Sequence, residues 1–164
     1  MELNEKLWGM IQALAAVPAR SAPKAVVLAL NSIIGDGADE ATSYVSMDTT
    51  QSTTTWNCWV VTEHSIGHAR IDYDRYLYDQ HQESQEEVTP CAWSTWVRPL
   101  YDILGLRYGA FYAVEGTPTI FEPAEPITVI FSNEEIRIPE RPVPVEQRAA
   151  LGNFVTRLRD CVEF

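Results

Sequence analysis

Residues 56–79 read "WNCWVVTEHSIGHARIDYDRYLYD". The first part is rich in aromatic and branched side chains, which pack well on a pleated surface and favour a strand. The "SIG" that follows offers a bend, and "IGHARIDYD" has the composition of a returning strand. The stretch therefore predicts two antiparallel strands joined by a tight bend.

The same pattern continues on both sides of this stretch. Aromatic and branched runs, separated by short polar, proline or glycine linkers, extend over residues 42–140 and predict an antiparallel sheet of about seven or eight strands. The runs are TSYVSMD, WNCWVVTE, IGHARIDYD, CAWSTWVRPL, DILGLRYG, AFYAVE, ITVIFS and EIRIPE. The acidic stretch "DYDRYLYDQHQESQEE" is interpreted as a solvated strand end that runs into a mobile loop.

Residues 1–35 predict a helical hairpin. Apolar residues recur at helical spacing over about residues 2–16. A second helix follows Ser21, which is a good capping residue, and Pro23, which suits a first helical turn. Gly35 offers the stop of this second helix.

Residues 144–164 carry one apolar stripe that includes Phe154 and Leu158, and they predict an amphipathic C-terminal helix. Such a helix must bury its stripe, so we expect it to cover the open end or face of the sheet. The length of 164 residues fits a single domain, residues 1–164, of the α+β class.

The order of these elements resembles that of bacterial pleckstrin-homology-like domains over about residues 42–164. The resemblance lies in the Val-Val-Thr strand end with its tight bend, in "IGHARIDYD" and "WVRPLYDILGLRYG", in the hairpin "PITVIFSNEEIRIP" and in the closing helix. It implies a curved antiparallel sheet or partly open barrel plugged by the C-terminal helix. It implies no particular activity, because such domains share a fold and differ in function.

Composition limits the classes of partner. The chain is 46% hydrophobic and carries a formal net charge of −11, which repels phosphate backbones and anionic membrane surfaces. We therefore expect neither direct nucleic-acid binding nor membrane binding. The three cysteines form no CxxC pair, and their odd number fits a reducing cytoplasm.

The two histidines of "EHSIGH" raise the question of a metal site. Metalloproteases place two such histidines on one helical face with the glutamate directly after the first, whereas Glu63 precedes His64 and a bend separates His64 from His68. We predict no metal and no cofactor, with His64 in the bend and His68 half-exposed on the returning strand. Stoichiometric zinc that is lost in His68→Ala would overturn this interpretation.

We find no sequence pattern of an active site. Cys58 and Cys161 lie at apolar positions and are interpreted as core residues, while Cys91 is less constrained. No recognisable Ser-His-Asp arrangement, phosphate-binding loop or Walker lysine is present in the sequence. The sequence therefore predicts a protein that is not an enzyme.

Tryptophans fall on both faces of the predicted sheet. Residues three apart in a strand point to opposite faces of the sheet. Trp56 and Trp59 therefore point to opposite faces, and Trp93 and Trp96 do the same. The N-terminal hairpin is expected to cover one face, and a partner or a second copy of the chain is the alternative cover. The candidate binding surface combines the residues Trp59, Trp96, Arg98, Tyr76 and Tyr78.

The function predicted from these features is a cytoplasmic protein-interaction module that is a monomer or a homodimer and whose protein partner is unknown. Two alternatives stay open. A small-molecule-binding or metal-dependent hydrolytic protein requires a concave pocket with convergent polar groups. An acidic inhibitor that mimics nucleic acid requires its negative charges on one contiguous face.

Overall fold

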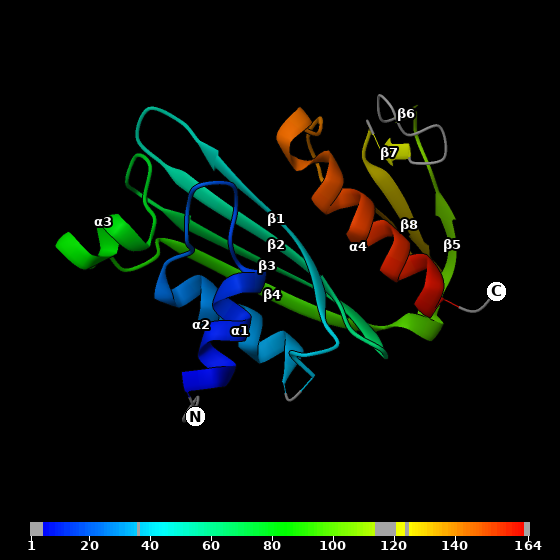
Figure 1. Ribbon diagram of the computed structural model, residues 1–164, viewed down its shortest axis with the longest axis horizontal. Coiled ribbons are helices and arrows are strands. Elements are labelled where there is room, and N and C mark those ends of the chain that lie inside the picture. Colours follow the sequence, from blue (N-terminus) through cyan, green and yellow to red (C-terminus); the bar gives the residue numbers. More distant parts are fainter. Residues whose placement is uncertain (1–4, 36, 114–120, 124, 163–164) are drawn as a thin grey trace. The chain divides into compact units, whose positions relative to one another are not determined.

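The chain has an α+β fold in which antiparallel sheets combine, over the described residues, with the four α-helices α1–α4 (Figure 1). The computed structural model describes residues 5–35, 37–113, 121–123 and 125–162. Two compact units divide the chain, Met1–Val97 and Arg98–Phe164, and each is described by itself.

The first unit is built on a four-stranded sheet with the strand order β1-β2-β3-β4. Its strands are β1 (Thr42–Thr49), β2 (Thr54–Val61), β3 (Ser65–Tyr73) and β4 (Ala92–Pro99). β1 pairs antiparallel with β2, and β2 pairs antiparallel with β3. The strands predicted in "WNCWVVTE" and "IGHARIDYD" are thus confirmed.

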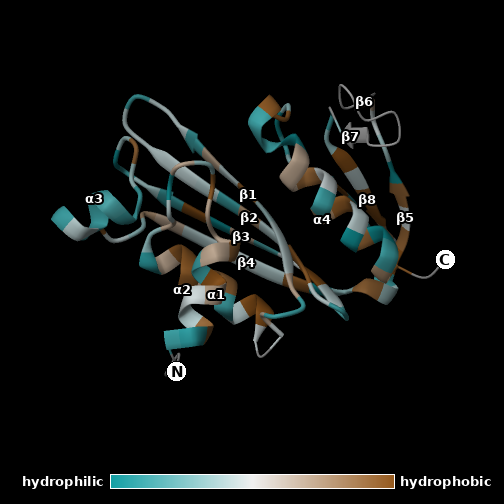
Figure 2. Cartoon of the chain, in the orientation of Figure 1, coloured by the Kyte–Doolittle hydropathy of each residue, from teal (hydrophilic) through white to brown (hydrophobic). Residues whose placement is uncertain are grey.

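The N-terminal hairpin is confirmed and covers one face of this sheet. α1 (Glu5–Leu14) contacts β1, and α2 (Lys24–Ile34) contacts β2 and β3. Figure 2 shows that α2 is largely hydrophobic, and its buried residues join Trp56, Cys58 and Val60 of β2 in one core cluster. The hairpin therefore buries its apolar stripes within its own unit.

The predicted mobile loop after β3 contains a short helix, α3 (Gln80–Gln85). Asp79 caps it, because the Asp79 carboxylate accepts a hydrogen bond from the Gln82 N–H at 3.0 Å. Glu83 in turn accepts from the Lys24 N–H at the start of α2, at 2.8 Å. Glu83 thus takes the capping role that the sequence predicts for Ser21.

The second unit contains a three-stranded sheet with the order β5-β8-β9 and a two-stranded ribbon of β6 and β7. Its elements are η1 (Leu100–Asp102), β5 (Ile103–Arg107), β6 (Phe111–Ala113), β7 (Phe121–Pro123), β8 (Ile127–Phe131), β9 (Glu135–Ile138), η2 (Val145–Gln147) and α4 (Arg148–Cys161). α4 contacts β7. Phe154 and Leu158 are completely buried, as their central place in the apolar stripe predicts.

The strands of the described residues therefore divide among three sheets, where the sequence predicts one. After Pro99 the chain forms the turn η1 before β5 begins, which interrupts the pairing that would continue a single sheet. β7 has no counterpart among the predicted strands, because it ends at Pro123 and proline discourages a strand.

Candidate functional site

Three rings from neighbouring strands lie together on the face of the first sheet opposite Trp56. Trp59 of β2 is paired with His68 of β3, and their rings stack with centroids 3.9 Å apart. The Trp96 ring of β4 has its centroid 5.8 Å from that of Trp59 and 6.0 Å from that of His68. The structure thus brings together Trp59 and Trp96 and adds His68, which the candidate surface omits.

Burial determines the chemistry of His68. The residue is 7% exposed, and among the described residues its Nε2 has no hydrogen-bond partner. Burial, with a further contribution from Arg70, lowers the pKa of His68 from 6.5 to about 4. The imidazole is therefore neutral at neutral pH. The expectation that His68 is half-exposed is wrong, because its ring packs against Trp59.

The bend between β2 and β3 separates the two histidines. The Thr62 N–H donates to the Ser65 carbonyl at 2.9 Å, and the Thr62 hydroxyl accepts from the Ser65 N–H at 3.1 Å. His64 lies in this bend with its side chain 86% exposed, whereas His68 lies on β3. Across the part of the chain that the structure describes, no group of three or more His, Cys, Asp or Glu side chains is placed to hold a metal.

Arg98 lies near the end of β4, where the second unit begins, and it packs against other residues of that unit. Its guanidinium pairs with Glu134, and its Cζ lies 4.7 Å from the ring centroid of Phe131 on β8. A cation over an aromatic face is a stabilising contact. Arg98 is thus held by its own unit.

The two tyrosines of the candidate surface have different environments. Tyr76 is 59% exposed, whereas Tyr78 is completely buried. The Tyr78 N–H donates to the Thr54 hydroxyl and its own hydroxyl accepts from the Val88 N–H, both at 2.8 Å. The Trp56 indole donates to the Tyr78 carbonyl at 2.9 Å. Tyr78 therefore anchors the segment after β3 in the core, and it does not line a surface.

The thiols of Cys58 and Cys91 are not activated as nucleophiles. Burial raises the pKa of the Cys58 thiol well above its ordinary value. Burial also raises the pKa of Cys91, and the neighbouring Asp74 adds to that increase. Both thiols are therefore protonated at neutral pH, and a thiol is a far weaker nucleophile than a thiolate.

β4 carries an apolar surface that the sequence analysis did not select. Trp93 and Val97 are 49% and 48% exposed, and Thr95 between them is exposed as well. Because successive residues of a strand alternate, these three side chains lie on the face opposite Trp96. Within the described residues, β3 is the one strand that pairs with β4. The alternation of the two tryptophans in "AWSTWV" was the signal for this surface.

The other edges of the four-stranded and three-stranded sheets carry features that hinder the addition of a strand. β1 contains Asp48, β9 contains Glu135 and Arg137, and β5 has a register irregularity after Ile103. Charges and bulges are the usual protection of an edge. Residues 92–97 of β4 contain no charged side chain. β4 itself ends in Arg98 and Pro99, and it differs from β1 and β9 in exposing two large apolar side chains, Trp93 and Val97.

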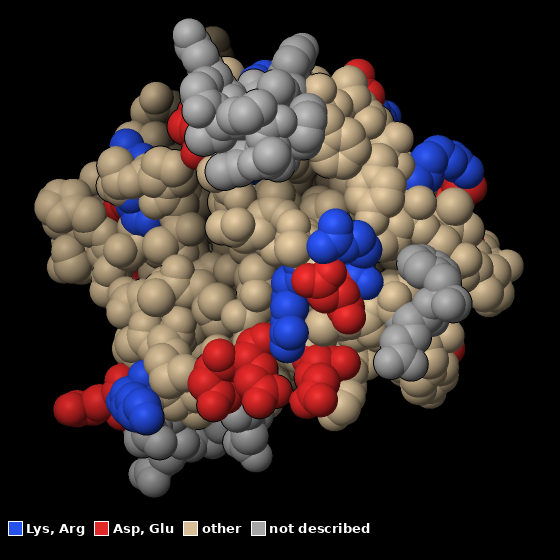
Figure 3. All heavy atoms as spheres, turned by 45° about the vertical axis from the view of Figure 1, so that its right-hand side comes forward, with Lys and Arg blue, Asp and Glu red and all other residues tan. Residues whose placement is uncertain are grey.

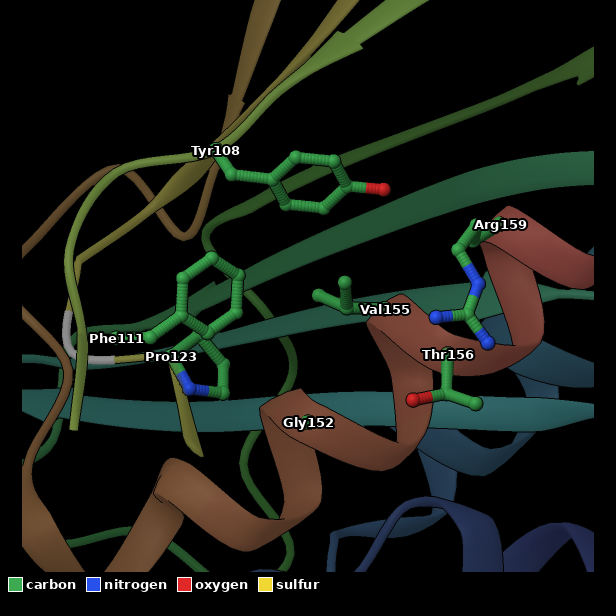
Figure 4. Close-up of a pocket in the computed structure, with 7 residues that line it drawn as sticks. All are labelled: Tyr108, Phe111, Pro123, Gly152, Val155, Thr156 and Arg159. Carbon is green, nitrogen blue, oxygen red and sulfur yellow. The ribbon is translucent and has the colours of Figure 1, made fainter. Parts of the chain in front are cut away.

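A hollow of about 350 Å³ lies beside α4 in the second unit. It is lined by Tyr108, Phe111, Pro123, Gly152, Val155, Thr156 and Arg159. Figure 4 shows Phe111 and Pro123 on one side of it, and Thr156 and Arg159 of α4 on the other. The Tyr108 and Phe111 rings are 5.8 Å apart and partly exposed, so the hollow has an aromatic wall open to solvent.

The polar end of this hollow is close to electrically balanced. Arg159 donates from Nε and Nη2 to Asp160 Oδ1, at 3.0 and 2.7 Å. Burial raises the pKa of the Tyr108 hydroxyl, which therefore stays protonated at neutral pH. The hollow offers hydroxyl groups and one paired guanidinium beside an apolar wall.

Acidic side chains alternate with basic ones at several places on the surface. Arg75 pairs with Glu86, and Arg107 pairs with Glu135. On the face drawn in Figure 3, a group of acidic side chains borders basic side chains. The surface charge on this face is therefore mixed in sign, although the chain as a whole is acidic.

Comparisons with known proteins give no relative: no family model, curated protein or solved structure matches the chain. Among the described helices, none has both the length and the apolar character required to cross a membrane.

Proposed function

We propose that this chain is a non-enzymatic protein-interaction module and that it binds its partner along the outer edge of β4. The observation that carries the proposal is the uncharged segment 92–97, which exposes Trp93 and Val97 at a sheet edge. Such an edge presents backbone donors and acceptors to an added strand, while exposed side chains give specificity. Tryptophan is also enriched among the residues that dominate binding energy.

The test is copurification from the native cell, followed by a binding measurement with the purified partner. Proteins that bind β4 copurify with the wild-type chain and are lost with Thr95→Lys, which places a charge on the edge. Val145→Lys is the control, because Val145 is an exposed residue and lies in η2, outside β4. The purified partner should then protect the amides of residues 92–97 from hydrogen exchange. Equal recovery with wild type and Thr95→Lys, or unprotected β4 amides, would contradict the proposal.

A second candidate function is the binding of a small amphipathic anion in the hollow beside α4. The aromatic wall of Tyr108 and Phe111 suits the apolar part of such a ligand. Thr156 and Arg159 suit its carboxylate. The probe is 3-phenylpropionate, compared with the uncharged 3-phenylpropanol by NMR titration. We expect shifts of α4 amides with the acid alone, and their loss in Arg159→Gln. Equal shifts with both probes would exclude charge recognition.

Two finer features belong to the same proposal. A cytoplasmic location is supported by Cys58, Cys91 and Cys161, which are all free thiols. A pleckstrin-homology-like character is supported by antiparallel strands that are followed by a C-terminal helix. Mimicry of nucleic acid needs a contiguous acidic face, and the pairing of Arg75 with Glu86 and of Arg107 with Glu135 gives it less support.

A further inference from the structure

We propose that the partner of the β4 edge is a second copy of this chain, added antiparallel about a two-fold axis that passes beside Thr95. This inference rests on the proposed function of that edge and identifies its partner. The two-fold arrangement is the commonest symmetry of homo-oligomers, and it requires a surface that is complementary to itself.

The side chains of β4 have this self-complementarity. Trp93 and Val97 are placed symmetrically about Thr95 and lie on the same face of the sheet. When two β4 strands pair antiparallel about Thr95, Trp93 of each copy lies opposite Val97 of the other. Aromatic and branched residues are a stabilising cross-strand pair. Both exposed apolar side chains of each copy are thereby covered.

The opposite face of β4 is compatible with the same register. Ser94 then lies opposite Trp96 of the second copy, so a small residue meets a large one. The exposed Trp93 and Val97 lie on the sheet face that α1 and α2 cover over β1, β2 and β3. Since the two-fold axis is perpendicular to the joined sheets, the hairpins of both copies lie on the same side of them.

Local charge at the docking segment argues against a basic partner. A basic partner would need carboxylates at the docking strand, and residues 92–97 contain none. Each chain carries a formal charge of −11, so two copies repel one another at low ionic strength. Salt screens that repulsion, with a Debye length of about 8 Å at physiological ionic strength. The dimer should therefore strengthen as salt is added, whereas a complex with a basic partner should weaken.

The first measurement is the mass of the full chain by sedimentation and light scattering over a range of protein and salt concentrations. We expect a monomer–dimer equilibrium that shifts toward the dimer as the protein concentration rises and as the salt concentration rises. Trp93→Lys should raise the dissociation constant on the order of tenfold or more, as for other central aromatic residues of interfaces. Val145→Lys, which places the same charge at an exposed apolar residue of η2, should leave it unchanged.

The second measurement is disulfide trapping. Directly opposite residues of antiparallel strands have Cα atoms about 4.5–5.5 Å apart, within the range of a disulfide. Thr95→Cys, in a Cys91→Ser background that removes the exposed native thiol, should form a covalent dimer on mild oxidation. Val145→Cys in the same background measures the disulfide formation that results from random collision. Selective trapping at position 95 supports the register.

Two outcomes would overturn the inference: a chain that stays monomeric at every concentration, or a dimer that Trp93→Lys leaves intact and Thr95→Cys does not trap. Neither outcome would by itself exclude strand addition by another protein. That broader function fails separately, when a purified copurifying partner leaves the β4 amides unprotected from hydrogen exchange.

Discussion

At the scale of single residues, His68 links burial to pH dependence. Its pKa is about 4 in the folded chain, against 6.5 as the ordinary value. Below pH 6.5 the unfolded chain therefore takes up a proton at this position, and the folded chain does not until about pH 4. The stability that the neutral ring contributes is complete above pH 6.5 and is lost as the pH falls toward 4.

The corresponding prediction compares wild type with His68→Phe, which keeps a ring beside Trp59 and cannot be protonated. Between about pH 7.5 and pH 5, the wild-type free energy of unfolding should fall by about 2 kcal/mol more than that of the variant. Urea denaturation followed by tryptophan fluorescence measures both. Parallel pH profiles would show that His68 titrates normally in the folded state.

Gly67 tests the packing of the hairpin on the sheet. A Cβ at this position would lie 2.3 Å from Cγ2 of Ile33 on α2 and 3.2 Å from the Trp96 carbonyl. Gly67→Ala should therefore destabilise the first unit by about 1–3 kcal/mol through overpacking. In an Ile33→Ala background, which removes Cγ2, the same substitution should cost much less. Equal costs in the two backgrounds, measured by urea denaturation, would contradict this contact.

At the scale of elements, the hairpin is required as a cover for its sheet. Deleting residues 1–35 would expose the core side chains Trp56, Cys58 and Val60 of β2 to water. We expect the shortened chain to aggregate or to lose its cooperative thermal unfolding. Light scattering and a thermal melt, each compared with the full chain, measure this. A folded and soluble product would mean that the hairpin is dispensable.

Most elements could be predicted from local pattern, and the exceptions have physical reasons. All eight predicted strands are present, because alternation and turn residues are local signals. α3 was missed because "QHQESQ" has no apolar stripe. Its stability depends on the Asp79 cap and on the pairing of Asp79 with Arg20, which is distant in the sequence. Local pattern does not report such contacts.

The candidate site was predictable to a similar extent. The meeting of Trp59 with Trp96 follows from strand order and alternation. The burial of Tyr78 does not, because it requires the segment after β3 to fold back onto Thr54 and Trp56. The exposure of Trp93 does not follow from the local pattern either, because it depends on how far the N-terminal hairpin extends across the sheet.

At the scale of the whole molecule, the chain has two compact units where the sequence predicts one domain. All five tryptophans lie within Met1–Val97, so intrinsic tryptophan fluorescence reports on the first unit. The core cluster that includes Trp56 and the hairpin is also confined to that unit. Hydrogen exchange at α4 amides reports on the second unit. The two units can therefore be followed separately in one protein.

The variant Phe154→Ala distinguishes a single cooperative domain from two units that are each stabilised by their own core. Phe154 is completely buried on α4, and truncation of such an aromatic side chain costs about 3–5 kcal/mol. If each unit is stabilised by its own core, the variant should exchange α4 amides on the order of a hundredfold faster or more, as that free energy implies. The denaturation midpoint seen by tryptophan fluorescence should then stay at its wild-type value. A midpoint that falls together with α4 protection would establish one cooperative domain, and unchanged α4 exchange would contradict the core position of Phe154.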